Sequence, residues 1–289
     1  MVLKTLCHEH VVIDLSMMKN DPDAQMLDGT AILEDLQQTV ASGIQRIIDV
    51  TNIGMGRDVR TAKALCEKAC VAVSFSTGFY KEPFFPKIVL EKSESELAAL
   101  MIKEITDGIE NTGERAKLIG EIGTGNEISP TEAKVFRAAA LAQRETGVPI
   151  YTHMTLGRLG LEQVKILKAA GADLEKVVIG HVDLNPELDY YLRLLDHGVY
   201  LGFDTIGKQT YQPDALRASL IVKLSNRGYA EKLLLSTDIT RLSHLRRYGG
   251  YGRAYLMESF VPMLRELGLS DRDLNLMLSE APEKLFGPF

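Results

Sequence analysis

The sequence predicts a (β/α)8 barrel that forms a single domain over residues 1–289. Short apolar runs alternate with helical segments, which is the pattern of a parallel sheet. A doubly wound open sheet would show the same alternation. The count of eight strand–helix units, and a length somewhat above the roughly 250 residues typical of barrels, favour the closed form. No Pro- or Ser-rich linker and no shift in composition divides the chain.

The expected strands are short runs rich in Val, Ile and Leu, as in parallel strands buried on both faces. They occupy residues 11–13, 44–50, 71–75, 117–122, 148–152, 176–180, 199–203 and 232–236. Helical periodicity is clearest at 93–109, 131–146 and 161–170. Glycines stand where helices should end, at Gly43, Gly147, Gly171 and Gly198. Residues 270–286 are expected to form a closing C-terminal helix.

Charge and composition exclude several classes of protein. The net charge is −6, so the chain offers no basic field for nucleic acid or for an acidic membrane surface. Three cysteines cannot build a disulfide framework, which favours a reducing compartment. No apolar run approaches the roughly 18 residues of a membrane span, and charged residues interrupt any signal core in residues 1–15. We therefore expect a cytoplasmic protein with a small-molecule substrate.

Polar side chains stand at the ends of several expected strands. The first strand carries His8 and His10, whose spacing directs both imidazoles to one side. Four more apolar runs end in Glu121, His153, His181 and Asp238. In a parallel barrel all these strand ends open onto one face, where barrel active sites lie. Four imidazoles and two carboxylates are therefore expected to converge.

Taken singly, each of these residues has a structural explanation, such as a hydrogen-bonded imidazole or a carboxylate that caps a helix. The joint pattern favours a metal centre, because imidazole and carboxylate suit ions such as zinc, iron or manganese. Six ligands suffice for two ions that share a carboxylate, and such a pair supports hydrolysis. His197, by contrast, precedes Gly198 near a helix end and is interpreted as structural.

The motifs around these residues resemble those of the phosphotriesterase-related branch of the amidohydrolase superfamily. They are CHEH at 7–10, STGFY at 76–80, EIGT at 121–124, TH at 152–153, GHVDL at 180–184, FDTIGK at 203–208 and STDITR at 236–241. The resemblance runs nearly from end to end and is strongest to the subgroup called phosphotriesterase homology proteins. It implies a (β/α)8 barrel with two divalent ions, usually zinc, with manganese, iron(II) or cobalt as alternatives.

The resemblance also implies a role for each candidate ligand. Carried over by position, the ligands of the more buried ion are His8, His10 and Asp238. Those of the more exposed ion are His153 and His181. Glu121 stands where many relatives have a carboxylated lysine, so it is expected to bridge the two ions directly.

The predicted reaction is hydrolysis of a small ester, in which a hydroxide between the ions attacks and Asp238 moves its proton to the leaving group. Barrels often bind phosphate with the loops after strands seven and eight, and Arg and Lys hold it. The expected substrate contacts are Tyr80, Lys208, Arg241, Arg246 and Arg247. A solvated basic segment explains Arg246 and Arg247 equally well, and packing against Phe79, Phe84 and Phe85 explains Tyr80.

The leading hypothesis is a lactonase or carboxylic esterase that acts on a phosphorylated sugar lactone or a similar anionic ester. A phosphotriesterase or phosphodiesterase would use the same ligands. A catalytically silent metal-binding protein is a third hypothesis, and the complete ligand set argues against it. The resemblance allows a homodimer, for which the stretch 84–86 is a candidate exposed apolar patch.

Overall fold

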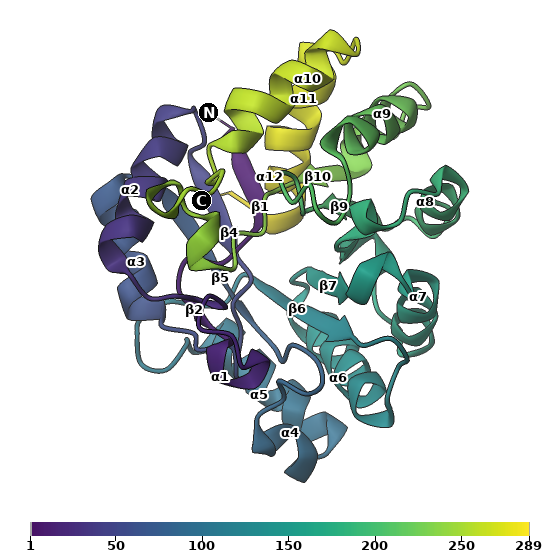
Figure 1. Cartoon of the computed structure of the whole chain (residues 1–289). Helices are drawn as coiled ribbons and strands as arrows, with labels where there is room; N and C mark the ends of the chain where they lie inside the picture. The colour runs from purple at the N-terminus through teal and green to yellow at the C-terminus, as the bar shows by residue number, and fades with distance from the viewer. Residues whose placement is uncertain (1, 289) are drawn as a thin grey trace.

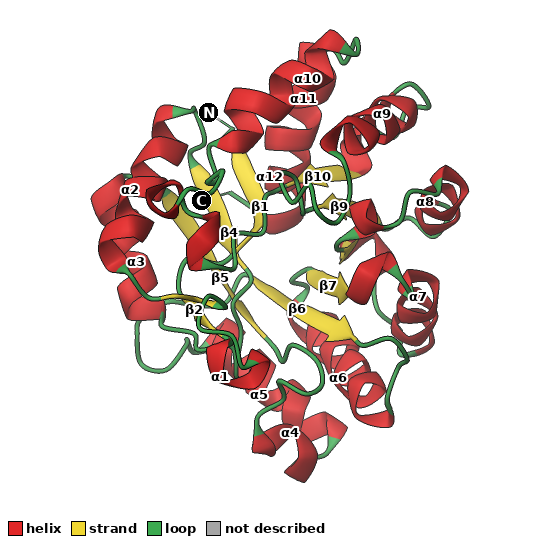
Figure 2. Ribbon diagram, in the orientation of Figure 1, coloured by secondary structure: helices red, strands yellow, loops and turns green. Residues whose placement is uncertain are grey.

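Eight parallel strands form a ring with helices on its outside in the computed structural model, which describes residues 2–288 (Figures 1 and 2). The strand order is β1-β4-β5-β6-β7-β8-β9-β10, and β1 and β10 contact each other. The predicted (β/α)8 barrel is therefore confirmed. No helix within residues 2–288 is long and apolar enough to cross a membrane.

The barrel strands are β1 (Thr5–Glu9), β4 (Arg46–Asp49), β5 (Ala72–Thr77), β6 (Leu118–Thr124), β7 (Ile150–Met154), β8 (Val177–Ile179), β9 (Tyr200–Phe203) and β10 (Leu233–Leu235). Seven of the expected runs overlap these strands. The run 11–13 is the exception, because the barrel strand lies earlier, where His8 and Glu9 obscure its apolar pattern. Residues Ile13–Asp14 (β2) instead pair antiparallel with Gln25–Met26 (β3).

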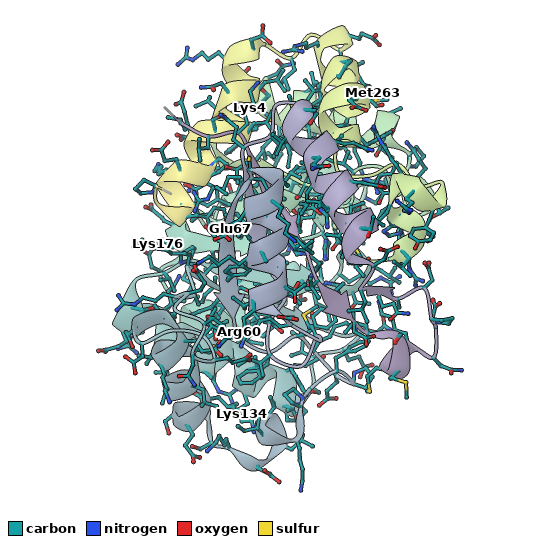
Figure 3. The ribbon with its side chains drawn as sticks, turned by 90° about the vertical axis from the view of Figure 1, so that its left-hand side faces the viewer. Lys4, Arg60, Glu67, Lys134, Lys176 and Met263 are labelled. Atoms are coloured by element: carbon teal, nitrogen blue, oxygen red, sulfur yellow. The ribbon has the colours of Figure 1, made fainter. Side chains whose placement is uncertain are left out.

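The helices are α1 (Ser16–Lys19), α2 (Gly29–Ala41), α3 (Val59–Ala69), α4 (Lys87–Glu91), α5 (Glu94–Thr106), α6 (Pro130–Thr146), α7 (Gly160–Ala169), α8 (Leu188–Leu195), α9 (Asp214–Ser225), α10 (Val261–Glu266), α11 (Asp271–Asn275) and α12 (Ala281–Phe286). Capping boxes start two of them, at Ser93–Glu96 and at Ser129–Glu132. Each outer helix buries one face. On α3, Arg60 and Glu67 lie on the exposed side that Figure 3 shows, while Leu65 and Cys66 are buried.

The interior of the barrel is filled by a second apolar cluster, separate from the layer between strands and helices. Its members from the strands, and from the residue after β4, are Cys7, Ile48, Val50, Leu118, Tyr151, Val178, Tyr200 and Leu234. The predicted C-terminal helix forms as α11, a π-helical turn and α12, and its residues Leu285 and Phe286 close this cluster. Arg46 of β4 donates to the Gly287 carbonyl over 2.7 Å, so the chain end is tied beneath the barrel. The polar side chains of the candidate site therefore lie at the carboxyl ends of the strands.

The expected exposed apolar patch at 84–86 is not formed. Phe84 and Phe85 are half-buried and pack against the main core cluster. The Phe84 ring lies 5.2 Å from that of Tyr80, centroid to centroid. Tyr80 and Phe84 are therefore part of the wall of the cavity described below.

Candidate metal centre

All six candidate ligands lie together at the carboxyl end of the barrel. His8 and His10 come from the end of β1, Glu121 and His153 from β6 and β7, and His181 and Asp238 from just after β8 and β10. The register of β6 against β7 shifts between Ile119 and Ile122, an irregularity of the kind often found beside active sites. Glu121 lies in this irregular segment.

Two glycines allow the ligands to approach one another. Gly120 precedes Glu121 with a φ of 140°, a conformation that L side chains rarely adopt. A Cβ atom there would collide with the carbonyl oxygen of Tyr151 on the next strand. Gly180 precedes His181, and a Cβ atom there would collide with the Thr152 carbonyl oxygen. The close packing of the strands therefore requires glycine directly before Glu121 and directly before His181.

Glu121 is the centre of the cluster. Its Oε1 lies 3.2 Å from His10 Nε2, and its Oε2 lies 2.8 Å from His153 Nδ1. The Nε2 atoms of His8 and His181 are each 3.5 Å from the same Oε2. One buried carboxylate therefore faces all four imidazoles, which is the arrangement that a shared ligand requires.

The donor atoms fall into two overlapping groups that could each hold a metal ion. One group is His8, His10 and Asp238, and the other is His8, Glu121 and His181. The Nε2 atoms of His8 and His10 are buried and have no hydrogen-bond partner. Because buried polar atoms are almost always partnered, a divalent cation fits these orphaned donors, and imidazole with carboxylate is a suitable ligand set.

The charges of the cluster are set by burial and by mutual contacts. Burial raises the pKa of Glu121, but electrostatic contacts with the imidazoles of His153, His8 and His10 hold it well below its usual range. The pKa of Asp238 is likewise low, because Lys208 and His10 outweigh the effect of burial. Burial lowers the pKa of His153 to about 4, so its ring is neutral and able to ligate.

Asp204 is a further candidate for the site, one that the sequence analysis missed. Its Oδ2 lies 3.6 Å from His8 Nδ1 and 3.5 Å from His181 Nδ1. Tyr151 donates to its Oδ1 over 2.6 Å, and the backbone N–H of His181 donates to Oδ2 over 2.9 Å. Burial raises the pKa of Asp204 to about 7. Asp204 follows the apolar run 199–203, so the signal that identified the six ligands was present here too.

A cavity of about 300 Å³ opens above these candidate ligands. Of the expected substrate contacts, Tyr80, Lys208 and Arg241 line it. The Tyr80 hydroxyl lies 3.2 Å from His153 Nε2, and the Lys208 ammonium forms an ion pair with Asp238 Oδ2. Arg241 forms ion pairs with Asp21 and Asp23, which belong to the segment after β1.

Arg246 and Arg247 do not line the cavity. Arg246 forms an ion pair with Glu258, and Arg247 forms one with Glu34 of α2 over 2.5 Å. Both belong to a 3-10 turn at Arg246–Tyr248 that directs them to the outer surface. Their placement outside the cavity favours the alternative of a solvated basic segment, and the expected role in substrate binding stays a prediction. Two cavity cations that the sequence analysis did not select are Lys19 and Lys81.

Comparison with known proteins places the chain in a family. The model of the phosphotriesterase family matches residues 2–286. The protein belongs to this family. It is therefore a hydrolase, and the resemblance inferred from the motifs is confirmed.

Three relatives illustrate the range of the family. The phosphotriesterase homology protein of Escherichia coli is 43% identical over 98% of this chain and 97% of its own. Its crystal structure, with phosphate in the active site, has a TM-score of 0.96 and 42% identity over 99% of both chains. A lactonase from Listeria monocytogenes has a TM-score of 0.93 and 27% identity, over 99% of this chain and 94% of its own. An aryldialkylphosphatase from Saccharolobus solfataricus is 28% identical over 98% of this chain and 94% of its own.

Proposed function

We propose that this protein is a lactonase or carboxylic esterase that hydrolyses small anionic esters, such as a phosphorylated sugar lactone, with two divalent ions. The observation that carries the proposal is the position of Glu121. Its Oε1 faces His10 and its Oε2 faces His153, as one carboxylate shared between two ions would. The donor set favours zinc, with manganese, iron(II) or cobalt as alternatives.

In this proposal each ion takes ligands from different strands. The inner ion would be held by His8, His10 and Asp238. The outer ion would be held by His153 and His181, with Glu121 common to both. When bound, two such ions lower the pKa of a water molecule and withdraw charge from a substrate oxygen.

Asp238 performs the proton transfer in the proposed reaction. Its low pKa, caused by Lys208 and His10 against the effect of burial, keeps it ionised at neutral pH and able to accept a proton. Its side chain lines the cavity, so the same carboxyl group can return the proton to a leaving alkoxide. The Lys208 ammonium pairs with Oδ2, while Oδ1 faces His8 and His10. The Tyr80 hydroxyl, beside His153, is placed to donate to a substrate oxygen.

The cavity supports a small, anionic substrate. Its volume of about 300 Å³ is at the lower end of the range for small-molecule sites. Four cationic side chains line it: Lys19, Lys81, Lys208 and Arg241. The acidic side chains that line it, Glu121 and Asp238, are both assigned to the metal ions. The phosphate found in the active site of the Escherichia coli relative agrees with an anionic ligand.

The alternative is a phosphotriesterase or phosphodiesterase that uses the same metal ligands. The aryldialkylphosphatase among the relatives supports this alternative. The catalytically silent alternative is disfavoured because all six ligands are present and face one another.

The first test is the metal content of the purified chain together with hydrolysis of plain and phosphorylated sugar lactones. We expect about two ions per chain, lactone turnover, and a loss of 100-fold or more in kcat for Asp238→Asn. Arg247→Gln, outside the cavity, is the control. One ion or none would exclude the shared role of Glu121. Two ions with turnover of phosphoesters alone would favour the alternative.

A further inference from the structure

Arg217 of α9 is a buried charge outside both the candidate ligands and the wall of the cavity. Its side chain is 0% exposed. A guanidinium group is buried at high cost unless its charge is paired and its N–H groups are hydrogen-bonded. Two carboxylates provide the pairing, because Nε donates to Asp183 and Nη1 donates to Asp214, each over 2.8 Å. The remaining contacts of Arg217 show which part of the chain this costly arrangement holds.

Those remaining contacts all go to the loop after β9. The Nη2 group donates to the Thr205 hydroxyl over 2.8 Å and to the Lys208 carbonyl over 3.4 Å. The Nη1 group also donates to the carbonyl of Gln212. Arg217 therefore binds this loop near its start, at Lys208 and again before α9 begins.

Asp183, two residues after His181, holds the start of the same loop. Its Oδ1 accepts the backbone N–H of Asp204 over 3.3 Å. Its Oδ2 accepts the backbone N–H of Thr205 over 3.1 Å and the Thr205 hydroxyl over 2.6 Å. Asp183 is itself fully buried, so its charge depends on Arg217 for compensation. The Thr205 hydroxyl connects the two, since it donates to Asp183 and accepts from Arg217.

The held segment, residues 204–208, begins and ends with side chains that face the candidate ligands. Asp204 Oδ2 lies 3.6 Å from His8 Nδ1 and 3.5 Å from His181 Nδ1. The Lys208 ammonium forms an ion pair with Asp238. Arg217 contacts neither of these side-chain charged groups. It holds the backbone and the Thr205 hydroxyl between them, so it can act on the site only through Asp204 and Lys208.

We propose that Arg217 is a positioning residue, which sets how Asp204 meets the two imidazoles and how Lys208 meets Asp238. This inference rests on the proposed function, since it assigns how the metal ligands and the proton-transfer carboxylate are held. A planar guanidinium with five N–H donors can contact two carboxylates and the loop at once, whereas a lysine ammonium cannot reproduce that geometry. A displacement of about 1 Å at a reacting group can lower a rate about 100-fold.

The first test is Arg217→Lys in the full-length protein, because it keeps the charge and removes only the geometry. Zinc affinity, measured by competition with a chelator, should fall about tenfold, as expected when a carboxylate that orients ligand imidazoles is displaced. For a sugar lactone we expect kcat to fall about tenfold or more, with KM within about twofold of the unmodified value.

A second pair of variants tests the same contacts without touching the buried ion pair. Thr205→Val removes the hydroxyl that connects Asp183 to Arg217 and conserves the volume of the side chain. It should lower zinc affinity and kcat in the same direction as Arg217→Lys. Thr205→Ser retains a hydroxyl and should restore both. This pair keeps the test valid if Arg217→Lys does not fold.

Double-mutant cycles separate positioning from a general loss of stability. If Arg217 acts through Asp204, then Arg217→Lys should cause no further loss of zinc affinity in an Asp204→Asn background. If it acts through Lys208, it should cause no further loss of kcat in a Lys208→Gln background. Effects that are independent would multiply instead.

Arg46→Lys is the matched control, because Arg46 is a buried arginine that ties the chain at the other end of the barrel. It donates to Ser74 Oγ over 2.9 Å and to the Gly287 carbonyl over 2.7 Å. We expect this variant to lower the midpoint of thermal unfolding and to leave zinc affinity and kcat within about twofold of the unmodified values.

The positioning role is overturned if Arg217→Lys behaves as Arg46→Lys does, or if its losses multiply with those of Asp204→Asn and Lys208→Gln. Failure of the proposed function has a different signature. If the unmodified protein hydrolyses no lactone, the proposed reaction is wrong, and the zinc cycle with Asp204→Asn still tests Arg217. If lactones are hydrolysed and Arg217→Lys loses only stability, the reaction stands and the positioning role is wrong.

Discussion

The carboxylate of Glu9 accepts a hydrogen bond from the backbone N–H of Asp238 over 3.2 Å. The same carboxylate accepts the N–H groups of Thr237 at 2.8 Å and Ile239 at 3.1 Å. Asp238 has a φ of 49°, a left-handed conformation that is unfavourable for a residue with a side chain. Glu9 therefore holds the end of the last strand in the conformation that directs the Asp238 carboxylate toward His8 and His10.

Replacement of Glu9 tests this relationship. In Glu9→Gln, the side-chain NH2 group takes the place of one carboxylate oxygen. It cannot accept hydrogen bonds from the backbone N–H groups, so we expect a loss of about 1–3 kcal/mol in unfolding free energy. We also expect weaker binding of the ion held by His8, His10 and Asp238. Urea unfolding and metal content measure the two effects. Glu67→Gln, on the exposed side of α3, is the control, and unchanged metal binding in Glu9→Gln would contradict the role assigned to Glu9.

Asp204 should control the metal affinity of both sites, because its Oδ2 faces the Nδ1 atoms of His8 and His181. A carboxylate that contacts a metal-ligating histidine typically raises the metal affinity of the site 10- to 100-fold. We expect a loss in that range for Asp204→Asn, measured by competition with a chelator. Tyr151→Phe, which leaves the carboxylate and removes only its 2.6 Å hydrogen bond, should have a smaller effect. Equal effects of the two substitutions would instead indicate a packing defect.

His244 should make the stability of the protein depend on pH. Burial, followed by the charge of Lys208, lowers its pKa to about 4 in the folded chain, whereas an unfolded chain has a value near 6.5. Between these two values the unfolded chain binds a proton that the folded chain does not, so stability falls as the pH is lowered from about 6.5 to 4. We expect this group to account for about 1–3 kcal/mol.

The measurement is urea unfolding at pH 7 and pH 4.5 for the unmodified chain and for His244→Gln. The variant should lose less stability between the two pH values. His197→Gln, on the outer surface near the end of α8, is the matched control. Identical pH dependence in the unmodified chain and in His244→Gln would exclude the assignment.

We expect that substitution of Arg246 or Arg247 does not affect substrate binding. Their ion pairs with Glu258 and Glu34 lie outside the cavity, and exposed pairs of this kind contribute at most about 1 kcal/mol to stability. Arg246→Gln and Arg247→Gln should therefore leave KM for an anionic lactone within about twofold of the unmodified value. A tenfold rise in KM would show that these side chains reach the substrate after all.

The fold and the clustering of the six candidate ligands could be predicted from sequence because they depend on local rules. Buried parallel strands need continuous apolar runs, so a polar residue that ends such a run is conspicuous, as at Glu121, His153 and His181. The parallel topology then brings all strand ends to one face. The same reasoning failed for β1, whose last two residues, His8 and Glu9, are buried polar residues inside the strand itself.

The tertiary structure alone decided which charges are neutralised and by which partner. Arg246, Arg247, Lys208 and Arg241 are equivalent in the sequence as basic residues of the last two loops. Their partners are Glu258, Glu34, Asp238, and Asp21 with Asp23, respectively, which lie 12 to 220 residues away along the chain, and only the folded chain pairs them. A cationic side chain is free to bind a ligand only if it is not already paired with a carboxylate. Such pairing depends on distances in the folded protein, which cannot be deduced from spacing along the chain.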